Sequence, residues 1–217
     1  MKRLLVLVEG QTEERFIKQV LQPHLWRYQV SIEPKIVMTK RVIGAAAHKG
    51  GGDYSKVRAD LKRLLGDSNA VAVTTLFDFY GFPGQVPGTD AQTYSSIEAL
   101  TDAINRDVGD ARFSAYLQRH EFEAFLFVDS WVTAQVAQQS DKQPAIEAQR
   151  KSFTTVEDIN LNPQFAPSKR LTAILGRYSK PLTGAVVAQQ IGMDRLRAEC
   201  PRFSLWVAWL ESFGQKT

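Results

Sequence analysis

Two long apolar runs, each followed by an acid, constrain the fold of this chain more than any other feature of its sequence. The first is LLVLV at residues 4–8, which precedes Glu9, and the second is AVAVTTLF at residues 70–77, which precedes Asp78. Continuous apolar runs, in contrast to alternating ones, are typical of strands buried on both faces of a parallel sheet. Ligands bind to such sheets at the carboxyl ends of the strands, so both acids fall where a site would form.

The segment after Glu9 has the pattern of a helix. Thr12 can cap it, Glu13 and Glu14 fall in its first turn, where the helix dipole favours acids, and Pro23 is expected to end it. Its apolar stripe consists of Phe16, Ile17, Val20 and Leu21. Strand, tight turn and helix form the opening half of a βαβ unit.

Further strands are predicted at residues 30–39, where Pro34 weakens the pattern, and at residues 113–117. Helices are predicted at residues 54–65, ended by Gly66, and at residues 97–108. We therefore predict an α/β domain at residues 1–130, with a mostly parallel sheet flanked by helices.

Beyond residue 130 the sequence is rich in glutamine and in helix-forming residues, interrupted by the irregular stretch NLNPQFAPSKR. From Leu171 onward it predicts a helical tail, so residues 131–217 are expected to form a helical extension packed on the sheet domain. The tail residues expected in the core are Leu205, Trp206, Trp209, Leu210 and Phe213.

Composition limits the kinds of site that the chain can build. Cys200 is the only cysteine, and the three histidines lie far apart, so any metal would be held by oxygen. A net charge of +4 permits a polyanionic partner without requiring one. The apolar run after Lys2 and Arg3 is too short for a signal peptide, and no stretch approaches the roughly 20 apolar residues of a membrane span. The sequence predicts a cytoplasmic protein with no membrane partner.

The acids at the strand ends suggest a metal site. If the two strands are parallel neighbours, Glu9 and Asp78 emerge at the same edge and repel each other unless a cation lies between them. Carboxylate oxygens select Mg²⁺ or Mn²⁺. A third acidic segment is HEFEAFLF, where a helix would bring Glu121 to the site and leave Glu123 second, whereas a strand would present both. The alternative is that these acids are solvated turn residues or flank a buried aromatic patch.

Several segments together resemble a known family. VEGQTE, TLFDFYGFPG, HEFEAFLF, PSKR, YSKPLTG and CPRFSLWVAWLE occur in this order and span most of the chain. They resemble a bacterial family of uncharacterised TOPRIM-like proteins. TOPRIM is the Rossmann-like, metal-binding α/β fold of topoisomerases, primases and overcoming-lysogenization-defect (OLD) nucleases. The resemblance to OLD nucleases implies a role in defence against phage.

The resemblance implies roles for particular residues. It implies a catalytic Glu at the end of the first strand, matched by Glu9, and a further metal-binding Glu, matched by Glu13. The family also has an Asp-x-Asp pair for Mg²⁺; Asp78 matches its first acid, but Tyr80 occupies the second position. Glu121 or Glu123 could supply the missing oxygen. Asp53 and Asp90 are further candidates from loops.

The function that follows is a metal-dependent nuclease, since divalent ions activate water and stabilise charge in phosphodiester hydrolysis. The basic residues Lys169 and Arg170 of PSKR, and then Arg177 and Lys180, are candidates for binding phosphate. The alternative for PSKR is a helix start that Ser168 caps.

Two other functions remain open. One is a non-catalytic TOPRIM-like binding or regulatory subunit of a separately encoded AAA-type ATPase, with Tyr80 marking a decayed site. The other is a phosphohydrolase of small molecules. His48 and Lys49, beside three glycines, could cradle a phosphate, but the loop lacks the Lys-Ser/Thr ending of a P-loop.

Overall fold

The structure is a computed structural model that describes residues 1–37, 54–79, 82, 86–87, 96–159, 165–176, 178 and 180–215, with only the backbone of residues 180–182. Among these residues, no helix is long and apolar enough to cross a membrane.

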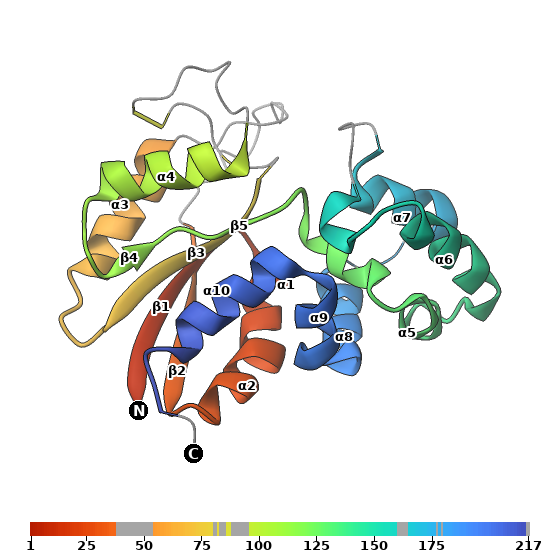
Figure 1. The fold of residues 1–217 in the computed structure, drawn as a ribbon, viewed down its shortest axis with the longest axis horizontal. Coiled ribbons are helices and arrows are strands. Elements are labelled where there is room, and N and C mark those ends of the chain that lie inside the picture. The colour runs from red at the N-terminus through yellow and green to blue at the C-terminus, as the bar shows by residue number, and fades with distance from the viewer. Residues whose placement is uncertain are drawn as a thin grey trace, which may run out of the picture.

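A parallel sheet forms the centre of the fold (Figure 1). Its strands are β1 (Lys2–Val8), β2 (Val30–Ile36), β3 (Ala72–Asp78), β4 (Phe113–Ser114) and β5 (Leu117–Gln118). The order is β2-β1-β3-β4, β5 also pairs with β3, and every pairing is parallel. The predicted α/β class with a parallel sheet is therefore confirmed, and β1 and β3 are direct neighbours.

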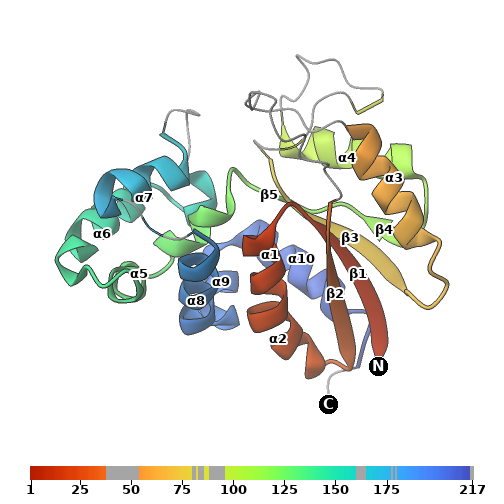
Figure 2. The ribbon, with the colours of Figure 1, turned by 180° about the vertical axis from the view of Figure 1, so that it is seen from behind.

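The continuous apolar run in β1 is explained by helices on both faces of the sheet (Figures 1 and 2). Leu5 and Leu7 pack in a cluster with α3 (Tyr54–Leu65) and α4 (Ile97–Val108). Leu4, Val6 and Val8 pack in a second cluster with α1 (Gln11–Phe16), α2 (Gln22–Trp26) and α10 (Pro201–Glu211). Both faces of β1 are thus removed from water.

The first helical segment differs from its prediction at both ends. Its N-cap is Gly10 rather than Thr12. The helix also does not end at Pro23, because a π-helical turn (Ile17–Leu21) joins α1 to α2 and Pro23 lies in the first turn of α2. The wider turn accommodates the proline ring, which would clash with the carbonyl four residues earlier in a regular α-helix.

Two predicted strands are modified by their neighbours. Pro34 is tolerated because β2 lies at the edge of the sheet. The single strand predicted at residues 113–117 is wrong, since it is divided into β4 and β5. The Thr75 hydroxyl divides it, because this group donates to the Tyr116 carbonyl (2.8 Å) and accepts the Tyr116 N–H (2.9 Å). A side chain thereby replaces the backbone ladder at this point.

The remaining elements are short helices, in agreement with the predicted helical C-terminal part. In chain order these elements are the 3₁₀ helix η2 (Phe122–Phe127), α5 (Ser130–Val136), η3 (Ser140–Lys142), α6 (Gln143–Lys151), η4 (Val156–Asp158), α7 (Pro167–Leu175), α8 (Lys180–Ile191) and α9 (Met193–Glu199). Helices α5, α6 and α7 gather at one side of the sheet, and α8 and α9 lie between them and the sheet (Figures 1 and 2).

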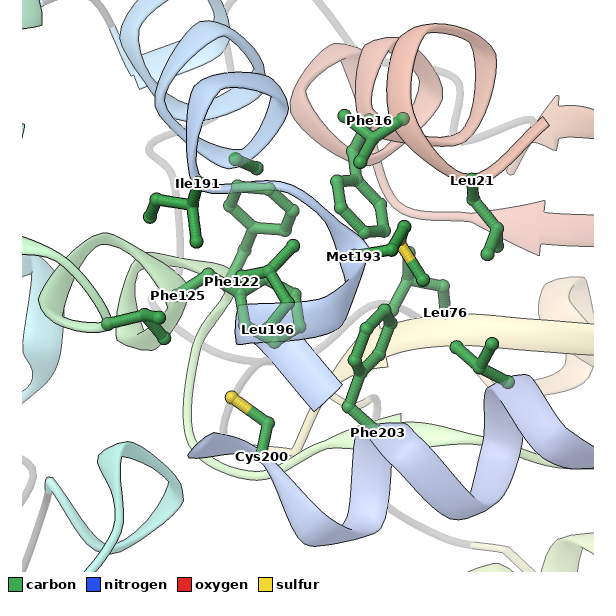
Figure 3. Packing of buried hydrophobic residues seen from close by; sticks show 14 of the residues in the cluster. Phe16, Leu21, Leu76, Phe122, Phe125, Ile191, Met193, Leu196, Cys200 and Phe203 are labelled. Atoms are coloured by element: carbon green, nitrogen blue, oxygen red, sulfur yellow. The ribbon is translucent and has the colours of Figure 1, made fainter. Parts of the chain in front are cut away.

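The last helix, α10, returns to the sheet. Phe203 packs against Phe16 and Phe125 in the larger core cluster (Figure 3), and the indole N–H of Trp206 donates to the Thr74 hydroxyl at 3.0 Å. Leu205, however, is 74% exposed, so its predicted core position is wrong. The division at residue 130 stays a prediction, and one core cluster contains residues from both sides of it.

Candidate functional site

Glu9 and Asp78 meet at the carboxyl edge of the sheet. The parallel register pairs Val8 with Leu76, so the residues that follow β1 and those that end β3 leave the sheet at the same edge. There the Asp78 N–H donates to Oε1 of Glu9 at 3.2 Å. Burial of the two strands on both faces is what positions this pair.

Two further segments are attached to this edge by carboxylates that accept backbone N–H groups. Oδ1 of Asp78 accepts the N–H of Phe122 at 2.9 Å and so caps η2. Glu121, the N-cap residue of η2, accepts the N–H of Ser168 at 2.8 Å through Oε2. Asp78 therefore joins the HEFEAFLF segment to the sheet, and Glu121 joins the PSKR segment to HEFEAFLF.

Glu13 and Glu123 are the two buried acids of the group. Glu13 is 9% exposed, and its Oε2 accepts the N–H of Gly10 at 3.0 Å, which closes the turn between β1 and α1. Glu123 is 6% exposed and lies in η2, so the helical alternative for HEFEAFLF is confirmed in its 3₁₀ form. Both carboxylates lie close enough to the strand ends for their negative charges to act on Asp78.

The charges of these acids act on one another. Desolvation by the surrounding protein, and then the charge of Glu13, raise the pKa of Glu9 to about 7, although the residue is exposed at the surface and accepts the Asp78 N–H. Burial and the charges of Glu9, Glu13, Glu123 and Glu121 raise the pKa of Asp78 well above its usual value. All five carboxylates thus contribute to one electronegative region centred on Asp78.

The donor chemistry of this region fits a hard divalent cation, because every candidate ligand is a carboxylate oxygen. Each of Glu9, Asp78 and Glu121 uses one oxygen for a backbone N–H and has a second oxygen. Within the described part of the chain, however, no three His, Cys, Asp or Glu side chains are gathered as a metal-ligand group. The acids are thus of the residue type that binds Mg²⁺, but the side chains of Glu9, Asp78 and Glu121 are held by hydrogen bonds to the backbone.

Comparison with known proteins identifies the family of this chain. A family profile described as a domain of unknown function (DUF4276) matches residues 8–211. The chain belongs to the DUF4276 family. No curated protein matches it.

Two solved structures are similar to this DUF4276 protein, both of the C-terminal region of the Xanthomonas campestris pv. campestris OLD protein. The one phased with mercury has 12% identity and a TM-score of 0.38, and the match covers 96% of this chain and 98% of that chain. The one phased with platinum has 12% identity and a TM-score of 0.40, with 98% and 97% covered.

The predicted phosphate-binding residues lie on α7 and at the start of α8. Lys169 is exposed in the first turn of α7, whereas Arg170 is half-buried. The PSKR segment does begin a helix, but its N-cap is Ala166, so capping by Ser168 is wrong. Lys180 begins α8, and its side chain lies outside the described residues. The other predicted residues outside them are His48, Lys49, Asp53, Tyr80, Asp90 and Arg177.

Sequence reasoning did not single out Tyr178 or Gly184, which both belong to YSKPLTG. The Tyr178 hydroxyl is buried without a hydrogen-bond partner in the described structure. Burial and the charges of Glu123 and Glu121 raise its pKa, so it borders the acidic region. A Cβ on Gly184 would lie 3.0 Å from the Phe122 ring and 3.3 Å from Thr12, so glycine permits α8 to pack closely there. The resemblance of this segment to a known family was the only signal for either residue.

Proposed function

We propose that this protein is a metal-dependent nuclease that hydrolyses phosphodiester bonds in DNA or RNA. The observation that supports it is the pair of carboxylates, Glu9 and Asp78, at one edge of a parallel sheet with pKa values raised by burial and by neighbouring acids. A region that concentrates negative charge in this way gains stability from a bound cation. Perturbed carboxylates at the ends of parallel strands are typical of functional sites.

The acids would have different roles in metal binding and proton transfer. Glu9 and Asp78 would hold Mg²⁺ or Mn²⁺, with Glu121, and then Glu13 and Glu123, completing the set. A divalent ion in such a site neutralises charge on phosphate oxygens and lowers the pKa of water. The pKa of Glu9 is about 7 in the metal-free protein, and a bound cation would lower it and keep Glu9 ionised, the form that can accept a proton from water as a general base. Lys169, Arg170 and Lys180 would neutralise phosphates of the bound strand.

The test compares wild-type protein with Asp78→Asn. Asparagine retains an oxygen for the Phe122 N–H but removes the charge, so the fold should persist and the metal-free melting temperature should rise. The Mn²⁺-induced rise in melting temperature and the nicking of supercoiled plasmid should both be lost. Asp141→Asn is the matched control, because Asp141 is 72% exposed and pairs only with Lys142 in the described structure. Full nicking by Asp78→Asn protein would overturn the proposal.

A second function is favoured by one observation. Glu9, Asp78 and Glu121 each accept a backbone N–H, so all three acids also have a structural use. In a non-catalytic binding or regulatory subunit, for instance of a separately encoded AAA-type ATPase, this use would be sufficient. Such a subunit would show no Mn²⁺-induced melting shift and no nicking, while Asp78→Asn would still raise its metal-free melting temperature.

A further inference from the structure

A cavity of about 390 Å³ lies beside α6 and α7, next to the first turn of α7. It is lined by Gln149, Phe165, Lys169, Arg170, Ala173 and Ile174, so two cations and an aromatic ring meet without an acid among the lining residues. Its volume falls within the usual range for small-ligand pockets. In both ribbon views α6 and α7 lie side by side at the side of the molecule away from α3 and α4 (Figures 1 and 2).

Arg170 is fixed in this cavity by several contacts. Its Nε donates to the Phe165 carbonyl at 2.7 Å, and its Nη1 donates to Oε1 of Gln149 at 2.5 Å. Its guanidinium lies 5.1 Å from the centre of the Phe153 ring and 5.6 Å from that of the Phe165 ring. No carboxylate of the described residues forms an ion pair with Arg170, so its charge is available to an anionic ligand.

Phe165 is the second unusual member of the cavity. It is 55% exposed, although a phenyl ring gains free energy from burial. The hydrogen bond from Arg170 to its carbonyl and the guanidinium beside its ring hold it at the mouth of the cavity. An exposed, positioned ring next to cations is the combination that single-stranded nucleic acids bind, through stacking of bases and pairing of phosphates.

The cavity is also connected to the acidic region. The N–H of Ser168 donates to Glu121, and Lys169 is the next residue along α7. A strand with a phosphate at the acidic region could therefore place a neighbouring nucleotide on this side of α7.

We propose that this cavity binds one unpaired base of a single-stranded nucleic acid, with Phe165 as the stacking surface and Lys169 as a phosphate contact. The proposal rests on the proposed function for the class of ligand, and it makes single strands, or unpaired regions of duplexes, the preferred substrate. Arg170 presents the ring and adds its own guanidinium plane for stacking.

The experiment measures binding of fluorescein-labelled oligothymidylate and oligouridylate of about 12 nucleotides by anisotropy, in EDTA. Phe165→Ala should weaken binding about 5- to 150-fold, the range for losing one stacked base, and Phe165→Leu should weaken it similarly. Phe165→Trp should bind as wild type does. Trp131→Ala is the control, since Trp131 is 56% exposed on α5 and does not line the cavity.

Lys169→Ala should reduce the salt dependence of binding by about one phosphate contact. Equal affinities of wild type and Phe165→Ala protein, or an equal loss in Trp131→Ala protein, would overturn the inference. Retained affinity in Phe165→Leu would also overturn it, because the cavity would then require only apolar contact.

These outcomes are separable from those of the nuclease proposal, because EDTA removes any requirement for metal. Phe165-dependent binding in a protein with no Mn²⁺-induced melting shift would retain the subsite and reject the nuclease. Suppose instead that the Mn²⁺-induced shift and nicking depend on Asp78 while Phe165→Ala leaves binding unchanged. The nuclease proposal would then be supported and the subsite rejected.

Discussion

Glu9 shows how a single carboxylate can make a structural hydrogen bond and have a shifted pKa at once. One of its oxygens joins β1 to β3 through the Asp78 N–H, while burial and Glu13 raise its pKa to about 7. Gln at this position would keep the oxygen and lose the basicity. We therefore expect Glu9→Gln to fold as wild type does, to bind Mn²⁺ more weakly, and to nick plasmid about 10²-fold more slowly or worse. Unchanged nicking by this variant would leave Glu9 with its structural use alone.

The pKa of Glu9 also predicts a pH dependence of stability in the metal-free protein. The folded-state pKa is about 7, against 4.5 for an unperturbed glutamate, so between these values the folded state binds more protons than the unfolded state. The free energy of unfolding should therefore fall as pH rises from about 4.5 to about 7, and this loss should be complete above pH 7.

The measurement is the difference in melting temperature between Glu9→Gln and wild type across this window. The difference should grow with pH, in favour of the variant, and then become constant. Comparing the two proteins cancels the opposite trend from His120, whose pKa is lowered to about 4 by burial and by Arg119. A difference that does not change with pH would contradict the raised pKa.

At the scale of elements, the carboxylates of Asp78 and Glu121 replace missing helical partners. Helices begin with N–H groups that have no acceptor within the helix, and these two acids supply acceptors to η2 and α7. The positions of β3, η2 and α7 relative to one another therefore depend on these two side chains. If such an acid both positions backbone and contributes charge to a site, removing only its charge should affect activity, and removing the whole side chain should affect stability as well.

Glu121 allows that separation. Glu121→Gln retains an acceptor for the Ser168 N–H, so it should melt near wild type and yet lose nicking if its charge is needed. Glu121→Ala should also lower the free energy of unfolding by about 0.5–2 kcal/mol, the range for a lost cap. Glu123→Gln should reduce nicking less than Glu121→Gln does. Thermal melts and plasmid assays of both variants measure this. A larger loss of nicking in Glu123→Gln than in Glu121→Gln would make Glu123 the acid that matters more for cleavage.

In the molecule as a whole, α10 packs the C-terminal end of the chain against the central sheet. Trp206 stacks on Tyr116 with ring centres 4.5 Å apart and donates to Thr74 in the middle of β3. The last helix thus covers the same face of the sheet as the first. This packing connects the C-terminal part of the chain to the strand that carries Asp78.

Trp206→Phe should lower the free energy of unfolding by about 1–3 kcal/mol, because a buried hydrogen bond and buried volume are lost. The Mn²⁺-induced melting shift should be unchanged, since no acid is affected. Leu205→Ala, one residue earlier and exposed, should change stability by no more than about 0.5 kcal/mol. Denaturant titrations of the three proteins measure this, and equal stability of all three would show that α10 contributes little to closing the core.

The features that depend on local burial can be read from the sequence alone. The unbroken apolar runs predicted strands covered on both faces, and the parallel pairing of those strands brought Glu9 and Asp78 to one edge. The helices at residues 54–65 and 97–108 followed from apolar stripes at helical spacing. In each case the signal lies within one element, because periodicity reports which side of that element is buried.

Features that depend on a partner far along the chain are visible only once the elements have packed together. The Thr75 hydroxyl divides the strand at residues 113–117, a π-helical turn carries the first helix past Pro23, and Glu121 finds its N–H donor at Ser168. Phe165 and Arg170 likewise become a cavity wall only when α7 packs beside α6. Local sequence constrains the conformation of a segment, whereas the acceptor, donor or ring that it meets is chosen by how the elements pack together.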